Sequence, residues 1–523
     1  LGRRLAGLYT RTMIWYLGGV LLLWLLGLEG IYGHPTPFYA AYAPAFQTLA
    51  VPLLLGVLVL GLIWWTQAAP LPGPRTLLLA VCAAAALAAL VVLYDQKHLD
   101  AGAGAVAGKA LLSLFAQLPG VAVALAGWAA LNRLLRDRDW FSWEPSPRER
   151  RWFLAGVFLF LVSISMALAM MRGGLGGISQ AYARDTYEYV GDIGKTSSIR
   201  SLFTRYVEIH DFLSMHAKVH PPGPIALLWF ISYFVGRTAL ALSVATVLLG
   251  SLAVFPLYFW ARGRFGEPAA RTACLLYALV PSIVLFTATS ADILFTPLTL
   301  ATLWIFDRAL ERSSSRDAVL AGLLYGLLTI LSFSLAGIGV YFALVGVWYC
   351  LLRRWKAVIK TAVIMFSSLA VFHLLLYAWS GYDSLETFHL AMKQFKLDQH
   401  HLDLVTPRLA AWTYRFWNPL AWFFFAGIPV SLLFLWRLWR PEASIRALVV
   451  IFLLTLAAFD CLYFARGEGE RSALYIFPFL VLPAAHGLDA CGRVARSTTP
   501  LMTTLGFLAF QCWLVEAYFY TYW

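Results

Sequence analysis

Two carboxylates stand close together in the segment Tyr182-Ala-Arg-Asp-Thr-Tyr-Glu188, which directly follows a long apolar run. A carboxylate at such a place can act as a general base, because deprotonating an alcohol requires an acceptor within hydrogen-bond reach. Asp185 and Glu188 are therefore candidates for taking the proton of an attacking hydroxyl. The alternative interpretation is that the two acids are solvated or paired with Arg184.

A turn with two arginines, Arg466-Gly-Glu-Gly-Glu-Arg471, precedes the apolar run that starts near Ser472. A guanidinium makes paired, charge-assisted hydrogen bonds to phosphate oxygens. The N-terminus of the following helix adds its positive dipole end. Arg466 and Arg471 are therefore candidates for binding a phosphate group, although an ordinary exposed turn would also explain the segment.

His220 opens the segment His220-Pro-Pro-Gly-Pro224, which leads into a short apolar stretch. Prolines fix the backbone and end a preceding helix. The segment either aims the imidazole of His220 into a cavity or simply forms the turn that starts the next helix.

A later polar loop, residues 380–415, is rich in ionisable groups that can hold phosphate or sugar hydroxyls. These groups are Lys393, Lys396, Asp398, His400, His401, Asp403, Arg408 and Arg415. The histidines near Asp403 match no specific metal-binding spacing. A basic helix that contacts lipid headgroups is the favoured alternative, so we predict no metal site and no cofactor.

The elements that must position these groups are membrane helices. Of the 523 residues, 61% are hydrophobic and only 13% are charged, whereas soluble domains have about 25% charged residues. A spanning helix needs about 20 apolar residues, and about fifteen runs of that kind can be found. The sequence predicts an all-α, polytopic integral membrane bundle with one additional short segment, Ile225–Gly236, that is re-entrant or interfacial.

The net charge of +13 has a simple explanation in such a chain, because Lys and Arg gather in cytoplasmic loops. The larger share of these residues falls inside only if Ile225–Gly236 does not cross the membrane. This assignment puts the N-terminus inside and the C-terminus outside. The polar loops 172–222 and 380–415, Asp292 and the Arg466–Arg471 turn then all face the extracytoplasmic side, as one active site would require.

Each long loop also carries an apolar stripe at helical spacing, Ile199–Leu213 in the first and Leu385–Phe395 in the second. Each stripe either lies on the membrane as an amphipathic helix or packs on the bundle. In both cases it can roof a cavity.

Together these motifs resemble the GT-C superfamily of polytopic glycosyltransferases, in particular its protein O-mannosyltransferase and aminoarabinose-transferase branch. The resemblance is carried by Asp185-Thr-Tyr-Glu188, by His220-Pro-Pro-Gly and by Glu470-Arg471 ahead of Tyr475 and Pro478, and it covers roughly Trp152–His486. It implies a polyprenyl-phosphate sugar donor, a hydroxyl acceptor of lipid, glycan or protein, and inversion at the anomeric carbon.

The resemblance also implies roles for single residues. Asp185 would be the base, with Glu188 as the reserve or as an orienter of the acceptor. Arg466 and Arg471 would bind the donor phosphate, and His220 would support the loop or touch that phosphate. Tyr187, Asp292 and Glu470, which stand in or beside the matching motifs, are candidates for substrate contacts. By residue type alone, the later polar loop adds Lys393 for the donor phosphate and His400 and Arg408 for the substrate. Family members often have adjacent acidic residues, whereas Thr186 and Tyr187 separate the two acids here, so the choice of base stays open.

The predicted organisation has three parts: four N-terminal helices with a cytoplasmic loop (1–151), a catalytic membrane module (152–490) and a C-terminal helix (491–523). No P-loop and no GxGxxG motif after a strand is present, which argues against a soluble nucleotide donor. Nucleic acid is not an expected partner, whereas membrane lipids are. The competing functions are a lipid-linked sugar flippase or transporter, and a membrane acyltransferase or polymer ligase.

Overall fold

The structure is a computed structural model, and it describes residues 103–136, 139–172, 174–184, 187–405, 414–439, 443–462 and 469–518. Every regular element in these ranges is a helix, which confirms the predicted fold class. Within these ranges, seven helices are long and apolar enough to cross a membrane, or eight if one bent pair forms a single span. The predicted runs near Met13, Phe46 and Thr76 lie outside the described residues.

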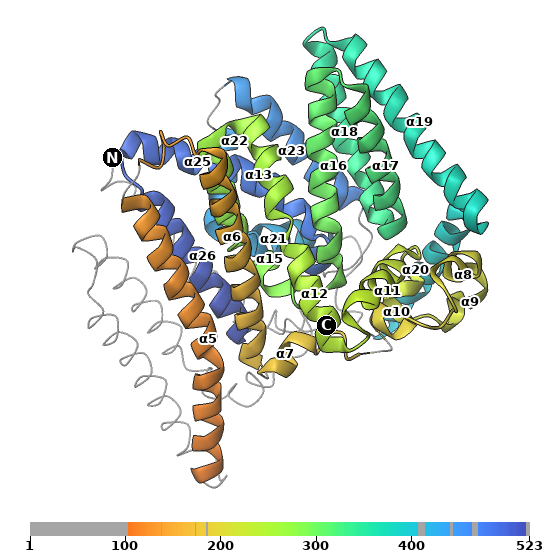
Figure 1. Cartoon of the computed structure of the whole chain (residues 1–523), viewed down its shortest axis with the longest axis horizontal. Coiled ribbons are helices and arrows are strands. Elements are labelled where there is room, and N and C mark those ends of the chain that lie inside the picture. The colour runs from red at the N-terminus through yellow and green to blue at the C-terminus, as the bar shows by residue number, and fades with distance from the viewer. Residues whose placement is uncertain are drawn as a thin grey trace.

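The longer helices form the body of the bundle, except α20 (Ser384–Val405), which lies beside α9 (Tyr206–Ile209) and α10 (Met215–Lys218) at its edge (Figure 1). They are α5 (Ala103–Arg136), α6 (Pro147–Ala169), α12 (Ala239–Ser251), α13 (Val254–Phe265), α14 (Glu267–Tyr277), α16 (Phe295–Arg312), α17 (Ser315–Leu331), α18 (Ile338–Leu351), α19 (Trp355–Ser380), α20 (Ser384–Val405), α21 (Tyr414–Phe425), α22 (Ile428–Trp439), α23 (Ala443–Leu462), α25 (Phe477–Ala495) and α26 (Thr499–Tyr518).

Shorter helices connect or cover the ends of these. They are η2 (Met170–Arg172), α7 (Leu175–Ser179), η3 (Tyr189–Asp192), α8 (Ile199–Thr204), α9 (Tyr206–Ile209), η4 (His210–Phe212), α10 (Met215–Lys218), α11 (Gly223–Val235), α15 (Pro281–Phe286), η5 (Ala291–Leu294), η6 (Phe333–Gly337), α24 (Gly469–Ser472) and η8 (Leu474–Ile476).

Local sequence explains where a spanning helix such as α6 begins. Ser146 caps its N-terminus and forms a capping box with Glu149, and Pro147 occupies the first turn, where no backbone donor is needed. After Arg151 the helix has no further charged residue. The whole helix of 23 residues corresponds to about 34 Å, which is enough to cross a bilayer core of about 30 Å.

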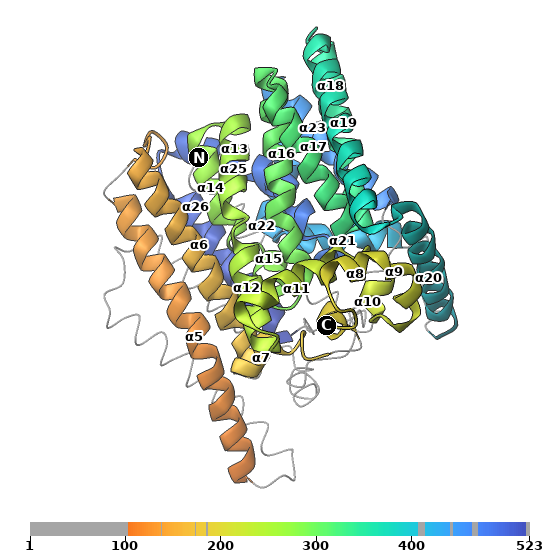
Figure 2. The ribbon, with the colours of Figure 1, turned by 45° about the vertical axis from the view of Figure 1, so that its right-hand side comes forward.

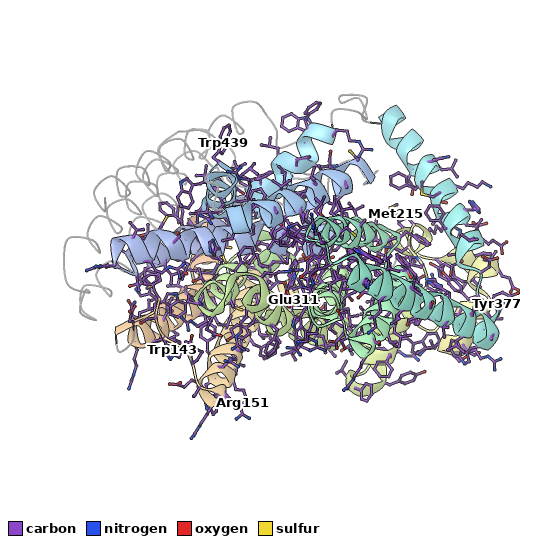
Figure 3. All side chains as sticks on the ribbon, turned by 90° about the horizontal axis from the view of Figure 1, so that it is seen from above. Trp143, Arg151, Met215, Glu311, Tyr377 and Trp439 are labelled. Carbon is purple, nitrogen blue, oxygen red and sulfur yellow. The ribbon has the colours of Figure 1, made fainter. Side chains whose placement is uncertain are left out.

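Close helix contacts depend on small residues, as is usual in membrane bundles. A Cβ added at Gly322 of α17 would lie 2.2 Å from the carbonyl oxygen of Met365 in α19. Gly322 therefore lets α17 and α19 approach backbone to backbone. At the periphery, the aromatic side chains of Tyr377 and Trp439 point away from the bundle and are exposed (Figure 3), as interfacial and lipid-facing aromatic residues do.

Two predicted spans are broken. The run near Leu420 forms α21 and α22, which meet at an angle of 109°. Gly427 sits at this break with φ +94°, and a side chain there would collide with Leu508. The run near Thr272 is divided into α14 and α15 ahead of Pro281, which cannot continue a helix hydrogen-bond ladder.

The short apolar segment forms α11, whose 13 residues are too few to cross a bilayer. Figure 2 shows α11 with α8, α9 and α10 in one layer across the ends of the long helices. The stripe Ile199–Leu213 is not one helix but α8, α9 and η4. Leu202 and Tyr206 within it are fully buried, so this stripe packs on the bundle.

The loops divide between two ends of the bundle. Among the described residues, the cluster end comprises 174–184, 187–222, 287–294 and 469–474, and the far end comprises 139–146, 262–267 and 493–498. Because α6 runs from the far end to the cluster end, the two ends are separated by about the length of that helix.

Candidate active site

Glu188 lies at the cluster end, in a turn closed by the hydrogen bond from its backbone N–H to the carbonyl oxygen of Arg184 (3.1 Å). Its side chain is 1% exposed. The Oε1 atom lies 3.4 Å from Nδ1 of His216 and 3.7 Å from Nη1 of Arg471. A carboxylate, an imidazole and a guanidinium from three segments of the chain thus meet in a buried place.

Arg471 reaches this point from α24, and it is also buried. A Cβ at Gly469 would lie 2.4 Å from the indole nitrogen of Trp422, so α24 is seated directly against α21. Nη2 of Arg471 lies 3.3 Å from Nε2 of His216. Arg471 thus contacts both Glu188 and His216 from α24.

Asp292 lies in η5 and completes the group, since its charge interacts with those of Arg471, His216 and Glu188. Its Oδ2 accepts a hydrogen bond from Ser290 Oγ at 3.1 Å. Its Oδ1 has no hydrogen-bond partner among the described residues. We refer to Glu188, His216, Asp292 and Arg471 as the polar cluster.

His220 forms part of the wall beside the polar cluster. His220 is half-buried, and its ring meets the ring of Tyr189 edge-on, with centroids 5.8 Å apart. Burial, assisted by the neighbouring His216 and Arg471, lowers the pKa of His220 to about 3. The imidazole is therefore neutral at physiological pH.

The Pro-Pro-Gly that follows His220 has a packing explanation. A Cβ at Gly223 would lie 2.0 Å from the carbonyl oxygen of Ile330, so only glycine lets α11 start against the end of α17. Tyr206 holds the preceding turn by donating to the carbonyl oxygens of Ala217 (2.7 Å) and His220 (2.8 Å). Both readings of this segment thus have support: it is a turn, and it also brings His220 next to the polar cluster.

Further tyrosines surround the cluster. Tyr182 shares a hydrogen bond with Thr246 (2.9 Å), and Tyr475 donates to Ser334 (3.0 Å). Burial, with the charges of Asp292 and Glu188, raises the pKa of Tyr189 well above its ordinary value. Tyr189 therefore stays protonated, and its hydroxyl can donate to an oxygen atom of a ligand.

The predicted site residues fall into three groups. The structure brings Glu188, Asp292, Arg471 and His220 together, with Glu470 buried next to Arg471. Tyr187 is 43% exposed beside Glu188, while Lys393 is exposed on α20. His400 lies in the second half of α20, and Asp185, Arg408 and Arg466 lie outside the described residues.

His216 was not predicted from the sequence, although it contacts both Glu188 and Arg471. No sequence feature distinguishes His216 from the many other ionisable residues of its polar loop. The one available signal is its position four residues before His220 in the segment His216-Ala-Lys-Val-His220.

Chemically, the polar cluster combines a buried cation with carboxylates that keep hydrogen-bonding capacity. Glu188 Oε1 and Asp292 Oδ1 have no hydrogen-bond partner within the described part of the chain. Buried acceptors without partners are rare in proteins and call for an explanation, such as a ligand. Over the same residues, no group of three His, Cys, Asp or Glu side chains is arranged to hold a metal ion.

Residues 219–379 match the family model described as dolichyl-phosphate-mannose-protein mannosyltransferase. This segment contains His220, Gly223 and Asp292. The match supports the resemblance to GT-C membrane glycosyltransferases that we inferred from the sequence motifs. No curated protein matches the chain.

Solved structures of three similar chains complete the comparison. An oligosaccharyltransferase from Archaeoglobus fulgidus, in a complex with Zn and sulfate, is 17% identical with a TM-score of 0.42, over 69% of this chain and 53% of that one. The same oligosaccharyltransferase tethered to an acceptor peptide is 14% identical with a TM-score of 0.41, over 70% of this chain and 55% of that one. ArnT from Cupriavidus metallidurans in the apo state is 13% identical with a TM-score of 0.40, over 65% of this chain and 75% of that one. The chain spans about half the length of the oligosaccharyltransferase chains.

Proposed function

We propose that this chain is a membrane glycosyltransferase that moves a sugar from a polyprenyl-phosphate donor to a hydroxyl acceptor, with inversion, at the extracytoplasmic membrane face. The observation that carries the proposal is the buried Arg471 beside Glu188 and Asp292 at one end of a membrane bundle. The matching family model is described by a dolichyl-phosphate sugar, which is a donor of the proposed class.

On the donor side, Arg471 binds the phosphate that leaves with the polyprenyl chain. Cleavage of the bond between the anomeric carbon and the phosphate oxygen puts negative charge on that oxygen. A preorganised guanidinium stabilises this charge best in a buried site. Arg466, Lys393 and His220 supply the remaining donor contacts in this proposal.

On the acceptor side, Asp185 accepts the proton of the attacking hydroxyl while the acceptor oxygen bonds to the anomeric carbon from the face opposite the phosphate. Glu188, the alternative base, already contacts Arg471 and His216. Its task is therefore to hold the guanidinium in position. Contacts to sugar and acceptor come from Tyr187, Asp292, Glu470, His400 and Arg408.

The test is transfer of radiolabelled sugar from a mixed pool of polyprenyl-phosphate sugars by purified protein in lipid vesicles. Wild type is compared with Asp185→Asn, which removes one charge with little change of shape, and with Glu208→Gln. Glu208 is an exposed acid of the same loop that pairs only with Arg205 (2.9 Å) among the described residues. We expect transfer by wild type and Glu208→Gln and none by Asp185→Asn.

Normal turnover by Asp185→Asn would remove Asp185 as the base and leave Glu188 as the candidate. No transfer by any variant, with the donor lipid nevertheless moved between leaflets, would contradict the proposal and identify a lipid-linked sugar flippase.

A further inference from the structure

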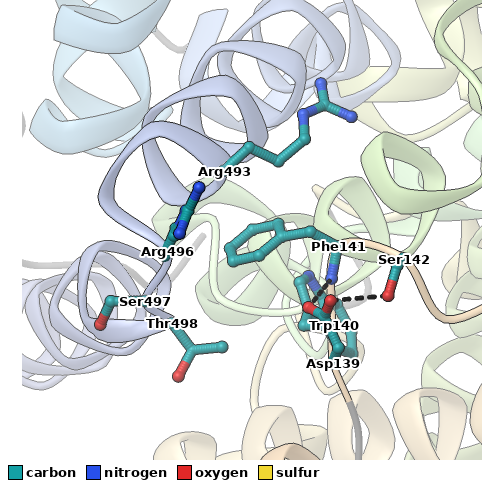
Figure 4. A pocket seen from close by; sticks show the side chains of 8 residues that line it. All are labelled: Asp139, Trp140, Phe141, Ser142, Arg493, Arg496, Ser497 and Thr498. Atoms are coloured by element: carbon teal, nitrogen blue, oxygen red, sulfur yellow. Dashed lines mark hydrogen bonds between the residues drawn. The ribbon is translucent and has the colours of Figure 1, made fainter.

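A second polar concavity lies at the far end of the bundle, away from the polar cluster. It encloses about 620 Å³ between the turn that joins α25 to α26 and the turn that precedes α6 (Figure 4). Arg493, Arg496, Ser497 and Thr498 line one side, and Asp139 with Phe141 lines the other. The proposed glycosyl transfer uses none of these residues.

The aromatic side of this concavity is held firmly. The ring of Phe141 packs on Gly492, where a Cβ would lie 2.1 Å from the ring. Behind it, Trp140 donates to Thr272 Oγ1 (3.2 Å). The guanidinium of Arg271 lies 4.8 Å from the Trp140 ring. Such a wall needs little ordering when a ligand binds, which lowers the cost of binding.

The charges on the two sides are opposite. Arg493 pairs with Asp489 (3.0 Å) on the same helix, whereas no ion pair is recorded for Arg496 within the described ranges. Across from them, the carboxylate of Asp139 accepts hydrogen bonds from Ser142 Oγ (2.6 Å) and from the Phe141 N–H (3.2 Å). These bonds lower the pKa of Asp139, so it is ionised at neutral pH.

Arg496 occupies a backbone conformation that arginine does not favour. Its φ is +48° at the C-terminal end of α25, a position at which glycine is the usual residue. A side chain in the left-handed region costs on the order of 1 kcal/mol. The cost is offset if the guanidinium has a binding task in the concavity that it lines.

The concavity also lies at a depth where lipid headgroups are found. It is formed at the N-terminal end of α6, a span of 23 residues whose other end leads into the loop of Glu188. The hydrocarbon core of a bilayer is about 30 Å thick. The concavity therefore faces the headgroups of the leaflet opposite the polar cluster, where pockets with basic residues between helices bind lipid phosphates.

We propose that this concavity binds the headgroup of an aminophospholipid, with the phosphate against Arg496 and Arg493 and the ammonium group toward Asp139. Ser497 and Thr498 offer hydroxyl donors to the same phosphate. A headgroup with both charges satisfies both sides of the concavity, whereas an anionic headgroup without an ammonium group leaves Asp139 unpaired.

The chain offers a matched pair of variants to test this site. Arg353 also lies at the far end, is exposed, and has a positive φ of 61°, but it does not line the concavity. Arg496→Gly and Arg353→Gly each remove one arginine from a left-handed position that glycine adopts without strain. Both variants should fold at least as well as wild type, so only the loss of Arg496 tests the site.

The experiment is native mass spectrometry of delipidated protein titrated with phosphatidylethanolamine or phosphatidylglycerol, with a parallel competition by inorganic phosphate. We expect wild type and Arg353→Gly to retain phosphatidylethanolamine preferentially. Arg496→Gly should retain it about tenfold more weakly, the size of one lost charge-assisted hydrogen bond. Asp139→Asn, which preserves the turn, should abolish the preference between the two lipids.

Three outcomes would overturn the proposal. Equal retention by Arg496→Gly and Arg353→Gly would show that the concavity holds no headgroup phosphate. A preference for phosphatidylglycerol that Asp139→Asn leaves unchanged would remove the ammonium contact. Displacement of the lipid by millimolar inorganic phosphate would identify a site for a soluble anion instead.

Discussion

Two buried charged groups, one at each end of the bundle, differ in how completely their hydrogen bonds are formed. At the far end, Asp307 of α16 accepts from Arg264 Nε (2.6 Å), Trp260 Nε1 (2.7 Å) and the hydroxyl of Tyr341 (2.9 Å). At the cluster end, Glu188 has contacts of 3.4 and 3.7 Å, and its Oε1 accepts no hydrogen bond from the described residues.

This difference separates a structural ion pair from a binding site. A carboxylate whose acceptor positions are all occupied fixes helices relative to one another and has nothing left for a ligand. A carboxylate and a guanidinium that meet loosely keep hydrogen-bonding capacity, which is costly in a buried place unless a ligand uses it. Burial and charge alone do not distinguish the two groups, whereas the number of short hydrogen bonds does.

Breaking the ion pair between Asp307 and Arg264 at the far end should have the largest effect, and this effect should be a loss of stability. Asp307→Asn removes the closest counter-charge of the buried Arg264 guanidinium, which then keeps only the longer ion pair with Glu311 (3.6 Å) among the described residues. The expected cost is about 3–5 kcal/mol in the free energy of unfolding. Denaturant unfolding in detergent micelles measures this cost. The exposed pair of Arg205 and Glu208 serves as control, because Glu208→Gln should cost less than about 1 kcal/mol. Equal losses in both variants would contradict the comparison.

Changing the cluster-end cation should instead affect activity. Arg471→Lys keeps the charge but loses the paired donors that match a phosphate, so we expect transfer to fall about 10²-fold. The midpoint of thermal unfolding should change much less than in Asp307→Asn. Arg205→Lys, at an exposed position of the first loop, should transfer normally. A stable Arg471→Lys variant with full activity would show that Arg471 is no phosphate ligand.

The seat of α11 beside the polar cluster should be sensitive to a single methyl group. Gly223→Ala forces the α11 backbone away from Ile330, and we expect a loss of about 1–3 kcal/mol together with reduced transfer. Gly263→Ala in α13 is the matched control, because no atom lies within 4 Å of the added Cβ. That variant should be as stable as wild type or more stable.

The smallest expected effect is a dependence of stability on pH, which comes from the lowered pKa of His220. Above about pH 7.5 the imidazole is almost entirely neutral in both the folded and the unfolded chain, so it contributes no slope to the free energy of unfolding. As the pH falls toward 3, the unfolded chain takes up a proton that the folded chain, with a His220 pKa of about 3, does not. The free energy of unfolding should therefore fall by about 1 kcal/mol between pH 7.5 and 6. His220→Gln should reduce that slope, and an unchanged slope would contradict the assignment.

Much of the architecture could be predicted because apolar length and basic loops report directly on membrane helices. The short length of Ile225–Gly236 indicated a segment that does not span, and α11 has that form. The bend between α21 and α22 could not be predicted, since it depends on Leu508 packing against Gly427 from a distant part of the chain.

The polar cluster could be predicted in part for a related reason. Glu188, Asp292 and Arg471 stand out in the sequence as ionisable residues next to apolar runs. A charged side chain is costly near the membrane, so its presence there indicates a functional role. His216 and Lys393 both lie in segments that the sequence marks as polar loops, where composition does not separate a half-buried imidazole from an exposed ammonium group. Only the fold of the loop, with η3 and α10 side by side, distinguishes them.

The close packing of Gly223 at the start of α11 against the backbone of Ile330 in α17 also has a consequence for biosynthesis. The ribosome makes α11 well before α17, so the surface that receives the start of α11 does not yet exist when α11 leaves the exit tunnel. An apolar segment too short to stop in the translocon must therefore wait at the membrane interface. The polar cluster can be assembled only after α17 has been inserted and α24, made later still, has delivered Arg471.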